Sequence, residues 1–229
     1  MGDMIELTAA DGTQVPAYEA RPAGKPRAAV VVLQEIFGVN SHIREVADGY
    51  AAQGYLAVAP ATFHRIKPNV QLGYTEADMN EGFGYKMAVE ALPAPGVMQD
   101  IQAAIDHAAK TSGGKVGIVG YCWGGLLTWR AACMLSGLSA AVPYYGGGVT
   151  TEEETARHPK TAVLAHFAEE DKWIPLDTVH AFAKAHPEVA LHLYAAHHGF
   201  NCDHRGAWHE PSAKLAKERT LAFFAQHLS

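Results

Sequence analysis

Apolar runs alternate with helical patterns along most of the chain. Residues 28–34, 55–60 and 115–120 form short runs of mostly apolar side chains, as expected of strands that are covered on both faces. Residues 140–148, 161–171 and 189–198 repeat this pattern in the second half. Between the runs, apolar residues recur every three or four positions, which predicts amphipathic helices that pack on the strands.

The predicted helices have recognisable ends. Asn40 or Ser41 can cap the first, whose apolar face ends at Gly54, and Pro95 opens a second that stops at the glycine pair 113–114. Further helices are predicted over 123–135, over 176–185 and from about 211 to the end of the chain. The section between residues 60 and 95 shows no regular pattern.

Strands that are separated by helices predict right-handed βαβ units and a mostly parallel sheet. The first twenty residues alternate around Asp11-Gly12, which predicts an antiparallel hairpin at the edge of that sheet. With no repeat or linker in view, we expect residues 1–229 to form a single α/β domain with helices on both faces of the sheet.

Composition and charge narrow the possible partners. The 229 residues are 48% hydrophobic and 18% charged, with a net charge of −6, which is typical of a globular protein and argues against nucleic-acid binding. No signal peptide or membrane-spanning run is apparent. The three cysteines are widely spaced and include no C-x-x-C pair, so we expect a cytoplasmic protein.

The stretch GIVGYCWGG, residues 117–125, holds the most informative of these cysteines. Cys122 lies in a G-x-C-x-G pattern between a predicted strand and a predicted helix, which is the context of a nucleophile elbow. In that turn the glycines avoid collisions, and the helix N-terminus favours a negative charge on the thiol. A free cysteine is otherwise most often a buried core residue, but the flanking elements favour a nucleophile.

A nucleophile on this turn needs a base and an acid that orients it, in the chain order nucleophile, acid, histidine. Asp171 and His198 follow predicted strands in that order. Glu169 and Glu170 are alternatives for the acid, and His197 is an alternative for the base. The histidines on predicted helices are expected to be solvated: His107, His180, His186 and His227.

Glu35 ends the first buried strand, where a carboxylate has no packing role. The loop after this strand normally supplies one N–H group of an oxyanion hole. We therefore expect the backbone N–H groups of Ile36 and Trp123 to form that hole, with Glu35 close to the thiol. An exposed loop glutamate is the simpler alternative.

The segments QEIFGVN, KVGIVGYCWGG, EEDKWIP, HHGF and ERTLAFF occur in an order that resembles the dienelactone hydrolase family, which has the α/β-hydrolase fold. The resemblance implies that Cys122, Asp171 and His198 form a catalytic triad and that Glu35 contacts the resting thiol. It also implies hydrolysis of a small cyclic enol-lactone through an acyl-cysteine intermediate, without a cofactor. A broad carboxylesterase or thioesterase is the alternative within this class.

Two positions depart from the family pattern. Well-known members bind the substrate carboxylate with two arginines, and the matching positions here hold Glu81 and Cys202. Both have lost the bidentate donor that an arginine supplies. Arg205 or Lys86 could replace it.

Two other kinds of protein compete with the hydrolase. The segment HHGFNCDH, residues 197–204, is rich in metal-binding side chains but matches no standard zinc spacing, so we expect no metal. A ligand-binding protein without catalysis would have no need of the three triad residues. The predicted partner is therefore a small lactone or ester, bound by a monomer or small homo-oligomer.

Overall fold

The computed structural model describes residues 2–229 and contains one eight-stranded sheet. The strands are β1 (Asp3–Thr8), β2 (Gln14–Ala20), β3 (Ala28–Leu33), β4 (Tyr55–Pro60), β5 (Val116–Tyr121), β6 (Leu138–Tyr144), β7 (Ala162–Ala168) and β8 (Ala190–Tyr194). Their order across the sheet is β1-β2-β4-β3-β5-β6-β7-β8. The six strands from β4 to β8 in that order run parallel, while β1 and β2 are antiparallel. This confirms the predicted sheet and its N-terminal hairpin.

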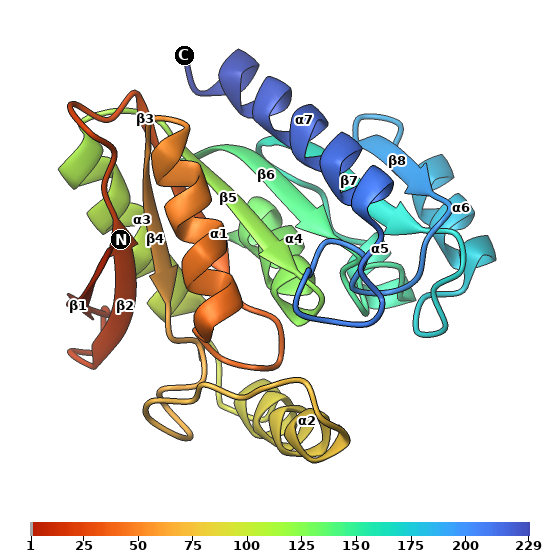
Figure 1. Ribbon diagram of the computed structural model, residues 1–229, viewed down its shortest axis with the longest axis horizontal. Helices are drawn as coiled ribbons and strands as arrows, with labels where there is room; N and C mark the ends of the chain where they lie inside the picture. Colours follow the sequence, from red (N-terminus) through yellow and green to blue (C-terminus); the bar gives the residue numbers. More distant parts are fainter. Residues whose placement is uncertain (1) are drawn as a thin grey trace.

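Helices cover both faces of the sheet (Figure 1). They are α1 (Ser41–Ala52), α2 (Glu76–Glu90), α3 (Met98–Ser112), α4 (Trp123–Met134), α5 (Glu152–Thr155), α6 (Leu176–Ala185) and α7 (Glu210–His227). Helices α1 and α7 lie on one face, and α3, α4 and α6 lie on the other. Every residue of β3, β4 and β5 is buried, which explains why these three strands read as unbroken apolar runs.

Three details differ from the sequence-based expectations. The helix expected from Pro95 begins at Met98, because Gly96 has a φ of +52° that a right-handed helix cannot contain. The short helix α5 was not expected. His186 is buried rather than solvated, and its ring contacts the Thr155 carbonyl and the Glu188 carboxylate at 2.8 and 2.9 Å.

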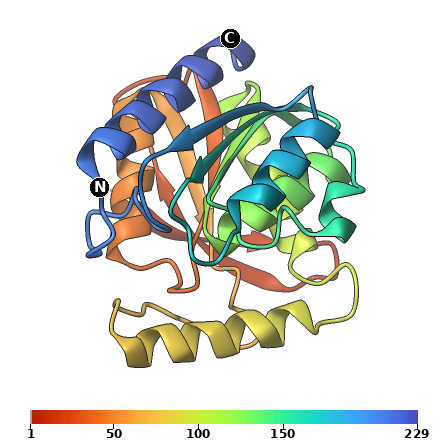
Figure 2. The ribbon, with the colours of Figure 1, turned by 90° about the vertical axis from the view of Figure 1, so that its right-hand side faces the viewer.

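Helix α2 lies in the section that showed no regular pattern, and it projects beyond the sheet (Figure 2). Its apolar side chains Met79, Phe83 and Met87 are exposed, so their spacing does not mark a buried face. A capping box between Thr75 and Asp78 marks its start and was the sequence signal available for it.

Candidate functional site

Cys122 occupies a tight turn between β5 and α4. Its φ and ψ are +55° and −117°, a backbone conformation that side chains other than glycine rarely adopt. A Cβ atom on Gly120 would collide with the Gly124 carbonyl, and one on Gly124 would lie 2.6 Å from the Leu33 carbonyl oxygen. The pattern G-x-C-x-G is therefore required by close backbone packing, which holds the thiol at the N-terminus of α4.

Asp171 and His198 meet beyond the ends of β7 and β8. The Asp171 side chain is fully buried, and its Oδ1 atom accepts hydrogen bonds from the backbone N–H groups of Trp173 and Ile174 at 2.8 and 3.2 Å. Its Oδ2 atom is 2.7 Å from His198 Nδ1. A carboxylate only accepts, so Nδ1 carries the proton and Nε2 remains available to the thiol.

The neighbouring acids and histidine make different contacts. His197 Nε2 lies 3.4 Å from Glu170 Oε2, and both side chains are more than half exposed. Glu169 is also exposed. Of the alternatives considered from the sequence, Asp171 and His198 are therefore the pair with a buried, short contact.

Electrostatics link His198 to Cys122. Burial lowers the pKa of the imidazole, but the Cys122 thiolate and the Asp171 carboxylate outweigh this effect and raise the pKa of His198 to about 10. Because the charged partners on both sides favour the imidazolium, His198 is suited to exchange a proton with the Cys122 side chain.

Glu35 follows β3 and is buried, in contrast to the exposed loop glutamate that was its alternative. Its Oε1 atom accepts a hydrogen bond from Arg205 Nη1 at 3.1 Å, whereas Oε2 is buried without a partner among residues 2–229. The Arg205 guanidinium also lies over the rings of Phe37 and Tyr74. Glu35 therefore has one oxygen held in an ion pair and one oxygen free.

The two N–H groups that are expected to form the oxyanion hole belong to Ile36, which follows Glu35, and to Trp123, which follows Cys122. Within residues 2–229, the N–H groups of Ile36 and Trp123 have no hydrogen-bond acceptor, so both remain able to donate to a substrate oxygen. The Trp123 indole is held by stacking on Phe63 at 5.0 Å and by a 2.7 Å hydrogen bond to Glu90. The backbone of Gly82 in α2 packs directly against the Ile36 carbonyl.

Glu81 and Cys202 stand where the family pattern has two arginines, and their surroundings differ from each other. Glu81 is exposed and accepts a hydrogen bond from Tyr85, and Cys202 is fully buried. Lys86 lies near the exposed ring of Phe83 on α2. Of the two possible replacements, Arg205 is the one whose charge lies beside Glu35, and it also interacts with the Cys122 thiolate.

Tyr145 is a site residue that the sequence analysis missed. It directly follows β6, its φ is +34°, and its hydroxyl is buried without a partner among residues 2–229. Its ring centre is 5.1 Å from that of His198. Burial, together with the charge of Glu35, raises the pKa of this phenol well above its usual value. The only sequence signal was its place at a strand end, before three glycines.

A cavity of about 330 Å³ opens beside His198. Lys172, Trp173 and Ala207 line it, and the Trp173 side chain is largely exposed. Cys122 is not among the residues that line it, so this cavity marks solvent beside the histidine and not the place of the ester. The metal-binding side chains of residues 197–204 do not all converge on one point. His197 and His198 contact Glu170 and Asp171, whereas Asp203 and His204 lie near each other and near His42.

Comparisons with known proteins agree with this architecture. The model of the dienelactone hydrolase family matches residues 15–228. A carboxymethylenebutenolidase from Pseudomonas putida is 33% identical over 227 residues, covering 96% of this chain and 95% of the relative. An Azospirillum brasilense protein, described as a candidate carboxymethylenebutenolidase, is 36% identical over 236 residues, with 98% of each chain covered.

Solved structures show the same fold. A Klebsiella pneumoniae protein described as a candidate dienelactone hydrolase has a TM-score of 0.84 and 32% identity, covering 99% of this chain and 98% of the other. A dienelactone hydrolase-like phosphotriesterase from metagenomic libraries has a TM-score of 0.77 at 20% identity, covering 100% and 99%.

The fold and these relatives define a carboxylic ester hydrolase with the α/β-hydrolase fold. The chain belongs to the dienelactone hydrolase family, as its motifs indicated. Within residues 2–229, no helix has the length and apolar character needed to cross a bilayer.

Proposed function

We propose that the protein hydrolyses a small lactone through an acyl-cysteine intermediate. The observation that carries the proposal is the contact of 2.7 Å between Asp171 and His198 on the two loops that follow β7 and β8, together with the strained turn that presents Cys122. These are the three parts that nucleophilic acyl transfer requires: a nucleophile, a base and a group that orients the base.

In this mechanism the Cys122 thiolate attacks the ester carbonyl, and the C–O bond of the lactone breaks. The oxyanion is held by the N–H groups of Ile36 and Trp123. The His198 imidazolium donates its proton to the leaving alkoxide, and the neutral ring then takes a proton from water, whose oxygen attacks the acyl-cysteine. Asp171 keeps the Nδ1 proton in place throughout.

Glu35 is proposed to hold the resting thiol with its free oxygen. Its other oxygen is held by Arg205 at 3.1 Å, so the ion pair sets the direction in which the carboxylate points. A substrate that carries a carboxylate would compete with Glu35 for this guanidinium, because Arg205 is the cation next to the thiol.

The decisive test is the Cys122→Ala variant, measured with a small activated ester and with a dienelactone. Loss of at least a thousandfold in kcat/KM is expected, and mass spectrometry of the wild-type protein during turnover should show one acyl group on Cys122. Cys133→Ala is the matched control, because Cys133 is buried in α4. Retention of full activity in Cys122→Ala would refute the mechanism.

A broad carboxylesterase or thioesterase is a second candidate. It is favoured by the exposed Glu81 and the buried Cys202, which stand where carboxylate-binding arginines were expected. A kinetic panel of dienelactones, neutral lactones, simple esters and thioesters separates the two. Preference for dienelactones that disappears in Arg205→Gln supports the lactone hydrolase, while preference for uncharged substrates supports the esterase.

A further inference from the structure

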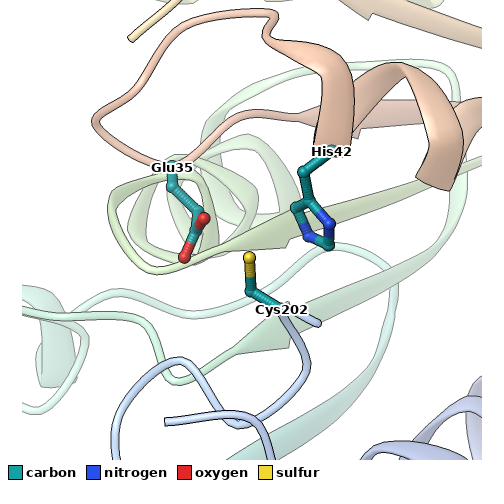
Figure 3. A group of neighbouring side chains, drawn as sticks. All are labelled: Glu35, His42 and Cys202. Atoms are coloured by element: carbon teal, nitrogen blue, oxygen red, sulfur yellow. The ribbon is translucent and has the colours of Figure 1, made fainter. Parts of the chain in front are cut away.

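Three potential metal ligands from distant segments meet inside the molecule. One donor atom from each of Glu35, His42 and Cys202 lies within 4.8 Å of the others, and all three residues are buried. Figure 3 shows the Glu35 carboxylate and the His42 ring on either side of the Cys202 sulfur. We propose that these three residues bind a zinc ion, which departs from the sequence-based expectation of no metal.

Two of the three residues each have a buried polar atom without a partner in the part of the chain that the structure describes. Within residues 2–229, Glu35 Oε2 and His42 Nε2 are buried side-chain atoms without a hydrogen bond. Buried polar atoms are nearly always paired, because leaving one unpaired costs free energy. A cation between them would satisfy both atoms at once. It would also occupy the Glu35 oxygen that is proposed to hold the Cys122 thiol, so the zinc-bound state and that contact exclude each other.

The second atom of each group is already held in a way that suits metal binding. Arg205 binds Glu35 Oε1 at 3.1 Å, and the Asp203 carboxylate lies 3.3 Å from His42 Nδ1. A carboxylate behind a histidine fixes the proton on Nδ1 and leaves the Nε2 lone pair for the metal. Burial lowers the pKa of His42, which keeps the imidazole in the neutral form that binds metals.

Cys202 completes a donor set that suits zinc. Its side chain is fully buried, and its sulfur lies between the Glu35 carboxylate and the His42 ring. Binding would form a Zn–S bond and release one proton per chain. Thiolate, imidazole and carboxylate together favour Zn²⁺ over Mg²⁺ or Ca²⁺, which prefer oxygen ligands alone, and a water molecule would be the fourth ligand.

A surface cavity lies beside His42, although Glu35 and Cys202 do not line it. A cavity of about 390 Å³ is lined by His42 and Asp203 and lies between α1 and the start of α7. Bond lengths of about 2.0–2.3 Å to zinc place neighbouring ligands about 3.5 Å apart. The three donors, within 4.8 Å of one another, would therefore need to draw together by about 1.3 Å at most.

A second group shares His42 but is less suited to a metal. Asp203 and His204 are not buried, and His204 Nε2 already contacts Glu45 at 3.0 Å. The buried group is therefore favoured, and His204→Ala serves as a control that separates the two.

Cobalt binding tests the site without using catalysis. Full-length protein with Cys122→Ala and no purification tag is titrated with Co²⁺ and then with Zn²⁺. We expect one Co²⁺ per chain, a near-ultraviolet sulfur-to-cobalt absorption band, visible bands of a tetrahedral ion, and displacement by Zn²⁺. Because the proposed nucleophile is absent from this background, the result does not depend on the proposed function.

Variants in that background identify the ligands. Cys202→Ala should abolish the sulfur-to-cobalt band, while Cys133→Ala and His204→Ala should leave it unchanged. Asp203→Asn should weaken binding about 10- to 100-fold, and because this side chain is about half exposed the variant should fold normally. A band that persists in Cys202→Ala, or no stoichiometric binding of Co²⁺ or Zn²⁺, would overturn the proposal.

Discussion

The Asp171→Asn substitution isolates the role of the buried carboxylate. An asparagine has the same shape, and its Oδ1 atom can still accept from the N–H groups of Trp173 and Ile174, so the loop should keep its conformation. The substitution changes the contact of 2.7 Å between Oδ2 of residue 171 and His198 Nδ1. The charge disappears, and an amide nitrogen facing Nδ1 would donate rather than accept.

The size of the effect follows from these two losses. A hydrogen bond to a charged group contributes about 1.5–3 kcal/mol, which corresponds to roughly a 10- to 150-fold loss at about 1.4 kcal/mol per factor of ten. In addition, an amide that donates to Nδ1 forces the proton onto Nε2, where it blocks the transfers that the mechanism requires. We expect a total loss of roughly 1,000- to 10,000-fold in kcat/KM.

Two assays separate the losses. The rate of hydrolysis of a small activated ester reports both losses together. Alkylation of Cys122 by iodoacetamide at pH 7 reports only the weakened thiolate–imidazolium pair, and its rate should fall roughly 10- to 150-fold. Burial raises the pKa of both Cys133 and Cys202 to about 12, so these thiols should react slowly and leave Cys122 as the labelled site.

Glu170→Gln is the matched control, since it removes a neighbouring acid that is largely exposed and should change neither rate more than twofold. The reasoning is refuted if Asp171→Asn stays within threefold of the wild type, or if Glu170→Gln shows the larger loss.

Two further predictions concern the turn and the histidine. Gly124→Ala should lower the free energy of unfolding by about 2–4 kcal/mol, because its Cβ would lie 2.6 Å from the Leu33 carbonyl oxygen. Gly147→Ala is the control in urea denaturation, since there is open space around Gly147. Equal stability of the two variants would contradict the packing argument. Since the thiolate and Asp171 raise the pKa of His198 to about 10, an NMR titration should show the imidazolium persisting through neutral pH and losing its proton near pH 10. In Cys122→Ala the midpoint should move to lower pH, because burial then opposes the charge with one partner fewer; an unchanged midpoint would exclude the coupling.

Local patterns predicted much of the architecture. Unbroken apolar runs identified the parallel strands β3, β4 and β5, because a strand covered on both faces leaves no position for a polar side chain. They failed for α2, in which Met79, Phe83 and Met87 are exposed and Val89 is buried. A pattern reports burial, and a helix with only two buried residues leaves little trace of its period.

In the candidate site too, some residues could be predicted from the sequence and others only from the fold. Cys122 was recognisable because its turn imposes glycines at fixed offsets, which is a requirement of the chain itself. Asp171 and His198 were candidates from their chain order, but only the fold brings them to 2.7 Å and sets them apart from Glu170 and His197. Which of two adjacent side chains points inward depends on packing against other segments.

What the sequence by itself determined was therefore the fold class, the turn that carries the thiol and the family to which the chain belongs, because short segments encode each of them. The tertiary structure alone decided that Arg205 pairs with Glu35, that Tyr145 lies beside His198, and that His42 and Cys202 meet Glu35 in the interior. These contacts join residues that are far apart in the chain. No local pattern encodes them, since they arise where loops from different strand ends converge at one edge of the sheet.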